Sequence, residues 1–304
     1  MNKKDNGKQV VSAYEIVFDG GRENGKRGVL VTVGELEVLF NKTNALDIYW
    51  VKYKGINVSF LSKNGLNSND GEFARRFEGG FLYTCGADNV SSCVEGKPVH
   101  GSLHYTSAEN VTVTVSGGEV EVCGTVRQSG LFGENLCLCR HYMVNRNGIE
   151  ARDTVCNDAY TEANYVLLYH TNFGYPFLDE NVALDIPFAS SEGLTPFAKS
   201  RADKQLTITE PVDGGNEEVF YNYLDKGEVT ITNAELNIRV KINYDVKDFP
   251  VLLQWKSMIS GDYALGIEPA VTRFDEFVTR SLKVGERKEY VIKYDFSPVT
   301  GNEK

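Results

Sequence analysis

The sequence has few of the residues that staple small extracellular proteins or anchor proteins in membranes. Its 304 residues include six cysteines, too few for the dense disulfide pattern of a secreted scaffold, and we expect them to be reduced inside a cell. A chain of this length also buries enough surface to fold without disulfides or a structural metal. No apolar run is long enough to span a bilayer, which excludes a helical membrane protein.

Positive charge is also scarce. The chain has 32 Lys and Arg against 42 Asp and Glu, a net charge of -10. The basic runs are short, such as Lys3-Lys4 and Arg75-Arg76, so nucleic acid and anionic membranes are poor partners. The opening residues MNKKDNGKQVVSAYE have no apolar core behind their lysines. We therefore expect no signal peptide and a cytoplasmic protein.

Sequence signatures of nucleotide binding and of serine hydrolysis are missing as well. The Gly-Gly pairs, such as Gly20-Gly21 and Gly79-Gly80, lack the strand–GxGxxG–helix and GKS/T contexts. No G-x-S-x-G nucleophile motif occurs.

Short Val-, Ile- and Tyr-rich runs dominate the chain and predict β-strands nearly everywhere. Gly and Asn turns separate these runs, which cover 29–40, 46–62, 111–126, 136–144, 217–224, 227–245 and 287–296. Strands at this spacing, without alternating helices, predict an all-β antiparallel sandwich. A short helix is considered only for 268–282.

We expect one domain over residues 1–304. The termini, about 1–10 and 298–304, should be frayed. The polar stretch 191–218 is interpreted as a surface excursion rather than a linker, because strand patterns continue on both of its sides.

The stretch LLYHTNFGYPFLDE (167–180) places His170 after an apolar run and before a Gly-Tyr-Pro turn. A histidine at a strand end can reach a cleft from a rigid base. Asn172, Tyr175 and Asp179 supply the polar and aromatic groups that line pockets for polar small molecules. The alternative is a core histidine bonded to backbone.

Two other segments could bind metal. His100 and His104 in VHGSLHYTSAEN would point to one side of an extended strand, but the helical context of known His-x3-His zinc sites is missing. In CLCRH, Cys137, Cys139 and His141 would share a strand face and could bind metal, but a packed face of buried cysteines explains them better. We predict no metal and no cofactor.

The segment DYALGIEPA (262–270) alternates between two faces. One face carries Ala264, Gly266 and then Glu268. Small residues beside a single carboxylate leave room for a ligand, and glycine within a strand often marks the close approach of another group. The alternative is an exposed edge glutamate.

These segments together resemble the galactose mutarotase-like (aldose 1-epimerase) superfamily, and more closely a poorly characterised branch of it. The resemblance lies in LDIYWVKYKGINVSFLS, FEGGFLYTCGADNV, HGSLHYTSAEN, LLYHTNFGYPFLDE and YALGIEPA, and covers about residues 46–270. It implies a β-supersandwich fold. It also implies an enzyme that interconverts sugar anomers by acid–base ring opening, with no cofactor.

By their positions in the matching segments, His100 resembles the first histidine of mutarotases and His170 the second. The resemblance implies that His170 is the acid that protonates the ring oxygen of the sugar. Glu268 is similar to the catalytic base, and Arg75 or Arg76 in FARR to the sugar-binding arginine. The substrate-binding aspartate of mutarotases has no match.

Asp245 lies in roughly the region of the missing aspartate, and Lys256 in LLQWKSM is predicted to bind substrate instead. The implied partner is a free or phosphorylated sugar. A non-catalytic carbohydrate-binding protein, or a sugar isomerase of another type, stays open, and so does the oligomeric state.

Overall fold

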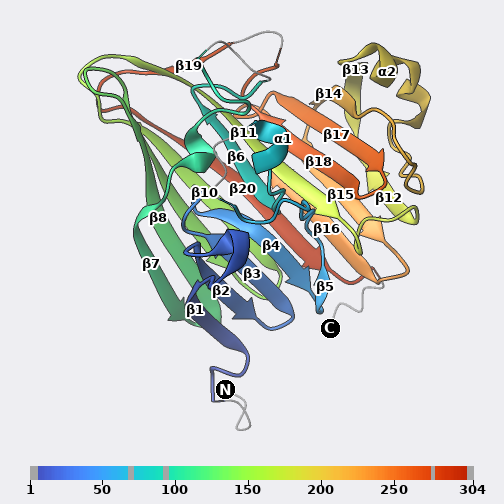
Figure 1. The fold of residues 1–304 in the computed structure, drawn as a ribbon, viewed down its shortest axis with the longest axis horizontal. Coiled ribbons are helices and arrows are strands. Elements are labelled where there is room, and N and C mark those ends of the chain that lie inside the picture. The colour runs from blue at the N-terminus through green and yellow to red at the C-terminus, as the bar shows by residue number, and fades with distance from the viewer. Residues whose placement is uncertain (1–5, 68–71, 92–95, 275–277, 300–304) are drawn as a thin grey trace.

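The structure is a computed structural model that describes residues 6–67, 72–91, 96–274 and 278–299. Most of these residues lie in three antiparallel sheets (Figure 1). The first sheet has the order β1-β2-β3-β4-β5. Its strands are β1 (Val11–Val17), β2 (Arg27–Val33), β3 (Leu36–Asn41), β4 (Asp47–Tyr53) and β5 (Ile56–Asn57).

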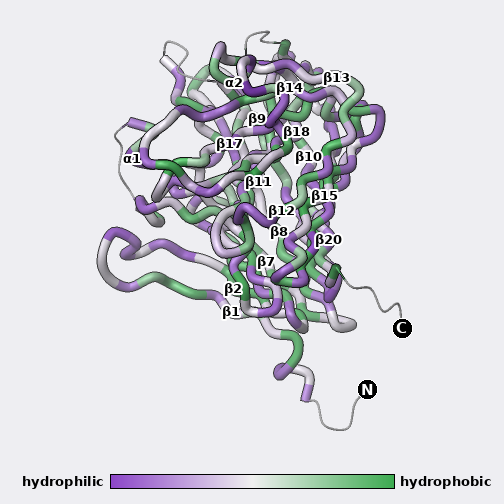
Figure 2. Tube along the Cα trace, turned by 90° about the vertical axis from the view of Figure 1, so that its right-hand side faces the viewer, coloured by the Kyte–Doolittle hydropathy of each residue, from purple (hydrophilic) through white to green (hydrophobic). Residues whose placement is uncertain are grey.

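The second sheet has eight strands in the order β12-β15-β16-β20-β10-β9-β8-β7. These strands are β12 (Val182–Asp185), β15 (Gly227–Asn233), β16 (Ile238–Tyr244), β20 (Arg287–Ser297), β10 (Gly148–Asn157), β9 (Asn135–Val144), β8 (Glu119–Ser129) and β7 (Glu109–Ser116). Hydrophobic and hydrophilic residues alternate along this sheet (Figure 2), because one of its faces packs on the core and the other does not.

The third sheet has seven strands in the order β13-β14-β17-β18-β11-β19, and β6 also pairs with β11. The strands are β13 (Phe188–Gly193), β14 (Glu218–Leu224), β17 (Val251–Ile259), β18 (Asp262–Ala270), β11 (Ala163–Gly174), β19 (Arg280–Leu282) and β6 (Leu82–Ala87). The helices are α1 (Phe73–Arg76), α2 (Pro196–Ser200) and three single turns, η1 (Gly21–Glu23), η2 (Leu103–Tyr105) and η3 (Ala202–Lys204).

The predicted all-β antiparallel sandwich is confirmed. The helix considered for 268–282 is wrong over its described residues, since Glu268 to Ala270 end β18 and Arg280 to Leu282 form β19; residues 275–277 lie outside the described residues. The stretch 191–218 is an excursion that carries α2 and η3 between β13 and β14. No helix in the described part of the chain is both long and apolar enough to cross a membrane.

The eight-stranded sheet forms one layer, and the other two sheets form the layer that faces it. Tyr290 and Tyr294 of β20 hydrogen-bond to Tyr165 and Thr171 of β11, at 2.7 and 2.9 Å. In the other direction, Phe40 of β3 packs on Tyr142 of β9, with ring centroids 4.8 Å apart. The five- and seven-stranded sheets meet where β4 contacts β6.

A buried arginine joins the layers. Arg140 of β9 donates through Nη1 to Asp47 of β4 at 2.5 Å, and through Nη2 and Nε to Asp153 of β10 at 2.9 and 3.1 Å. Tyr169 of β11 donates its hydroxyl to Asp153 at 2.5 Å. Arg140, Asp47 and Asp153 are at most 2% exposed. One guanidinium therefore neutralises two buried carboxylates that come from different sheets.

Replacing Arg140 should destabilise the fold severely. Arg140→Met keeps much of the side-chain volume but leaves Asp153 buried without its cation and Asp47 with His104 as its remaining cation. Removing one partner of a buried ion pair typically costs about 3–5 kcal/mol. We expect that loss in the free energy of unfolding, measured by urea denaturation.

Arg152→Met is the matched control for this variant. Arg152 lies in the adjacent strand β10, and its ion pairs with Glu150 and Glu289 are solvent-exposed. Its replacement should change stability by less than about 1 kcal/mol. Equal losses in the two variants would contradict the role given to Arg140.

Candidate active site

The structure brings His170 and Glu268 into direct contact. His170 Nε2 lies 3.2 Å from Glu268 Oε1, and the two side chains are 6% and 2% exposed. They come from the neighbouring strands β11 and β18 and lie on the face of the seven-stranded sheet turned away from the eight-stranded sheet. Two titratable groups are thus held together in a nearly dry environment.

Gly266 makes room for this contact. A Cβ atom at position 266 would lie 2.5 Å from Glu268 Oε1 and 3.2 Å from His170 Cε1. The expected space beside Glu268 therefore exists, and these two side chains occupy it. His170 was expected at a strand end, but β11 continues to Gly174, so the histidine projects from the strand interior.

Burial shifts the two pKa values in opposite directions. Desolvation, with a smaller contribution from nearby His100, lowers the pKa of His170 well below its usual value. Desolvation, with a smaller contribution from Glu217, raises the pKa of Glu268 well above its usual value. Both shifts favour the uncharged form, because a charge loses its hydration when buried.

Several polar atoms of the pair have no hydrogen-bond partner among the described residues. They are His170 Nδ1, Glu268 Oε1 and the amide oxygen of the neighbouring Asn172. The contact between His170 and Glu268 has the distance of an ion pair but not the angles of a hydrogen bond. Buried polar atoms are nearly always paired, so a cluster of unpaired ones indicates a functional site.

His100 lies beside His170, with ring centroids 5.6 Å apart. It does not lie on an extended strand, as considered from the sequence, but in a turn with φ of 61°. His100 Nδ1 contacts the Val90 carbonyl at 2.9 Å, so this nitrogen carries the proton. Gly101 is required here, because a Cβ atom would lie 2.3 Å from the carbonyl oxygens of Asn89 and Gly86.

Aromatic rings surround the pair. Trp255 and Phe77 lie 5.6 and 5.9 Å from the His170 ring, measured between centroids. Phe77 follows α1, which lies over this part of the sheet (Figure 1). Neither ring was predicted from the sequence. Trp255 is next to Lys256, which was predicted to bind substrate, and only the pairing of β17 with β18 shows that Trp255 is the one that faces the site.

Lys256 was predicted to bind substrate, but it does not lie on the sheet face that carries the pair. Leu253 is paired with Glu268, so alternation places Lys256, three residues on, on the opposite sheet face. Its ammonium group contacts the Lys204 carbonyl at 3.0 Å and Glu218 at 3.4 Å. The structure does not bring Lys256 to His170.

Of the other predicted binding residues, one lies beside His170 and two lie in the turn after β11. Asn172 donates to the Gly80 carbonyl at 3.0 Å and remains beside His170. Tyr175 is 75% exposed beyond the end of β11. Asp179 accepts hydrogen bonds from the Asn181 amide and the Asn233 side chain, both at 3.0 Å. Tyr175 and Asp179 therefore belong to the turn after β11 rather than to the pair.

The two arginines of α1 also lie apart from the pair. Arg75 is exposed. Arg76 stacks over the ring of Tyr105 at 3.6 Å, and the Tyr105 hydroxyl lies 2.9 Å from that of Tyr83. Asp245, considered in place of the missing aspartate, caps a turn by accepting from the Lys247 amide at 2.8 Å.

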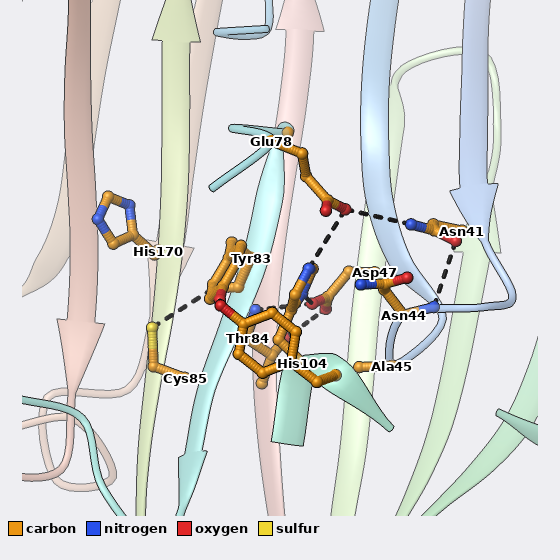
Figure 3. Close-up of polar contacts among 12 residues, drawn as sticks. Asn41, Asn44, Ala45, Asp47, Glu78, Tyr83, Thr84, Cys85, His104 and His170 are labelled. Atoms are coloured by element: carbon orange, nitrogen blue, oxygen red, sulfur yellow. Dashed lines mark hydrogen bonds and ion pairs between the residues drawn. The ribbon is translucent and has the colours of Figure 1, made fainter. Parts of the chain in front are cut away.

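His104 belongs to a second polar cluster, separated from His170 by the ring of Tyr83 (Figure 3). Tyr83 stacks on His104 with centroids 3.6 Å apart. His104 Nδ1 lies 2.7 Å from Asp47, and Nε2 lies 3.2 Å from Glu78. Burial opposes protonation, but these two carboxylates outweigh it and raise the pKa of His104 to about 9. Hence His104 is a charged structural residue, and the metal-binding role considered for it is not supported.

A large surface cavity of about 670 Å³ lies elsewhere. It is lined by the β8–β9 turn and the segment after β10, including Arg127, Phe132 and Tyr160. None of the predicted site residues lines it. We therefore place the candidate active site at the titratable pair and not at this cavity.

The family model described as "Domain of unknown function (DUF4432)" matches residues 23–285. A solved structure from Klebsiella pneumoniae subsp. pneumoniae, called a "putative aldose 1-epimerase", is 19% identical with a TM-score of 0.84, over 95% of this chain and 88% of that one. A galactose mutarotase-like protein from Clostridium acetobutylicum is 14% identical with a TM-score of 0.72, over 96% and 100%. No curated protein matches the chain. At these identities the structural likeness shows the fold, which is galactose mutarotase-like.

The charge of His104 should make stability depend on pH. A folded-state pKa of about 9 exceeds the unfolded value near 6.5, so the protonated ring stabilises the fold. This contribution is complete below about pH 6.5 and is lost as the pH rises through 9, up to about 3 kcal/mol in all. Urea denaturation across this range should show the loss in the parent but not in His104→Gln. The same slope in both proteins would contradict the assignment.

The two histidines on either side of Tyr83 should differ in charge at neutral pH. In ¹⁵N spectra of the imidazole rings at pH 7, we expect His104 to be protonated and His170 neutral, because of the opposite pKa shifts above. With four histidines, single His→Gln variants suffice for assignment. A His170 ring that titrates near its usual pKa would show that the pair is more hydrated than the structure indicates.

Proposed function

From the membership of this chain in the DUF4432 family and the geometry of its buried pair, we propose that it is an aldose 1-epimerase-like isomerase. Its reaction is the interconversion of the anomers of a sugar by ring opening. His170 and Glu268 carry the proton transfers.

One observation carries this proposal. An imidazole and a carboxyl group lie 3.2 Å apart in a nearly dry site, and burial shifts their pKa values so that both tend toward the neutral form. When both groups are neutral, the carboxyl group can donate a proton and the unprotonated nitrogen of the imidazole can accept one. Titratable groups whose environments push their pKa values far from the usual ones are candidates for acid–base catalysis.

Anomer interconversion needs this kind of pair. The hydroxyl oxygen and the ring oxygen of a cyclic sugar are bonded to the same carbon, so two adjacent groups can reach both. One group removes the hydroxyl proton while the other gives a proton to the ring oxygen, and the bond between the anomeric carbon and the ring oxygen breaks. The aldehyde rotates, and closure in the reverse sense gives the other anomer.

The tendency of both groups toward the neutral form changes the roles predicted from the sequence. Glu268 was expected to be the base and His170 the acid, facing each other across a ligand-sized gap. At 3.2 Å no such gap separates them. A neutral carboxylic acid that donates to the ring oxygen while a neutral imidazole accepts the hydroxyl proton gives the same product. The net charge of the pair stays zero throughout, and the imidazolium and the carboxylate that form while the ring is open neutralise each other, which suits a site of low dielectric.

The aromatic neighbours provide a surface for the apolar face of a sugar ring. Trp255 and Phe77 are half-buried and pack beside His170, and flat amphipathic rings stack well on sugars. Because His170 and Glu268 are almost fully buried, a sugar reaches them only after neighbouring side chains move. His100, whose ring lies beside His170, could then bind a sugar hydroxyl through Nε2.

Glu268→Gln is the sharpest test. It preserves size and hydrogen-bonding capacity but cannot exchange a proton, so anomer interconversion should slow by roughly 10²-fold or more while sugar binding persists. Saturation-transfer NMR or polarimetry on a panel of free and phosphorylated aldoses measures the rate. His170→Gln should cause a similar loss, and the double variant should be little worse than either single one, since the pair acts as a unit.

Glu37→Gln is the matched control, because Glu37 forms a solvent-exposed pair with Lys52 in the five-stranded sheet. Its rate should equal that of the parent. A Glu268→Gln protein that is as fast as the parent would refute the mechanism. A parent protein that binds a sugar of the panel but accelerates no aldose would favour a non-catalytic carbohydrate-binding protein.

A further inference from the structure

The outer face of the eight-stranded sheet carries a second group of chemically active side chains. Cys123 of β8 is paired directly with His141 of β9, and Glu121 lies two residues from Cys123 on the same face. One ligand atom from each of the three residues lies within 4.8 Å of the others. We propose that Glu121, Cys123 and His141 form a binding site for a thiophilic divalent metal ion, with Zn²⁺ as the expected occupant.

The spacing is close to what zinc requires. Zinc binds sulfur at about 2.3 Å and nitrogen or oxygen at about 2.0–2.2 Å in a tetrahedron, so neighbouring ligand atoms lie about 3.3–3.8 Å apart. The three ligand atoms lie within 4.8 Å of one another, so the side chains would have to rotate for all three to bind one ion. A thiolate, an imidazole and a carboxylate leave a fourth position for water, and this donor set suits Zn²⁺ better than Mg²⁺ or Ca²⁺.

The contacts of the three side chains leave donor atoms for a cation. His141 Nε2 is in close contact with Glu121 Oε1, while His141 Nδ1 has no partner among the described residues. The thiol of Cys123 lies near the Glu121 carboxylate and the Thr112 hydroxyl. A divalent ion would replace the repulsion between a thiolate and a carboxylate by attraction to both, with release of the thiol proton.

The surroundings allow an ion to enter. The side chains of His141 and Glu121 are 35% and 37% exposed, so solvent reaches them. A cation on the adjacent strand is Arg152, which is paired with His141 in the β9–β10 register. Its guanidinium is engaged by Glu150 and Glu289, at 2.7 and 2.8 Å, and the repulsion that it exerts on a metal ion is therefore reduced.

This inference is independent of the proposed isomerase reaction. The metal ligands lie on the outer face of the eight-stranded sheet, whereas His170 and Glu268 lie on the seven-stranded sheet of the other layer. A failure of either proposal leaves the other unchanged.

Cobalt substitution tests the site directly. The full chain without an affinity tag is stripped with a chelator and titrated with Co²⁺. We expect one equivalent to bind with a thiolate-to-cobalt charge-transfer band and the intense visible bands of four-coordinate cobalt, all displaced by Zn²⁺. Cys123→Ser should abolish the charge-transfer band. His141→Gln should weaken binding more than about tenfold, because the loss of even an outer-shell partner costs about 10- to 100-fold.

Cys139→Ser is the matched control. Cys139 lies one row further along the same sheet face, with its sulfur 3.7 Å from that of Cys137, and its replacement should leave the spectrum unchanged. Zn²⁺ should also raise the melting temperature of the parent and of Cys139→Ser, but not of the two ligand variants. No thiolate band in the parent, or the same band in Cys123→Ser, would overturn the proposal.

Discussion

The guanidinium of Arg140, bound between Asp47 and Asp153, is the interaction on which the two-layer arrangement depends. An isolated buried carboxylate is so costly that none of the three partners could occupy its place without the others. The carboxylates come from the five- and eight-stranded sheets, and Tyr169 of the seven-stranded sheet completes the group. The same contacts fix Asp47, which also holds the backbone amide of Thr84 in β6 at 2.8 Å. In this way a charge network sets the position of the strand that pairs with β11, where His170 lies.

The class of fold could be predicted from the sequence because period-two alternation is a local property of each strand. Runs such as 136–144 and 287–296 correspond to β9 and β20 within one or two residues. The Arg140 network could not be predicted, since its members are up to 122 positions apart, between Asp47 and Tyr169, and their contacts depend on which strands become neighbours. Alternation within CLCRH places Arg140 on the face opposite Cys139 and His141, but the cysteine face was the one expected to be packed, so a buried arginine was not predicted.

In the candidate site, too, local features could be predicted from the sequence and contacts between strands could not. His170 and Glu268 were identified from their local settings and from a family resemblance, and the structure places them in contact. Lys256 was predicted to bind substrate, but its neighbour Trp255 is the residue that faces the pair. A shift of one residue reverses the face of a strand, and only the pairing of β17 with β18 shows which residues face the site. The opposite pKa shifts of the two groups were also beyond the sequence, since they follow from the burial of both side chains.

Gly266 limits how this protein can be improved. Glycine inside a strand forgoes about 0.5–1 kcal/mol of stability relative to alanine, so a screen for thermostable variants would treat the position as an easy gain. Any side chain there would begin 2.5 Å from the Glu268 carboxylate and would displace it. Selection for stability alone would therefore tend to erase the pair without disturbing the fold, and relatives that have lost the chemistry should be recognisable by a larger residue at this one position.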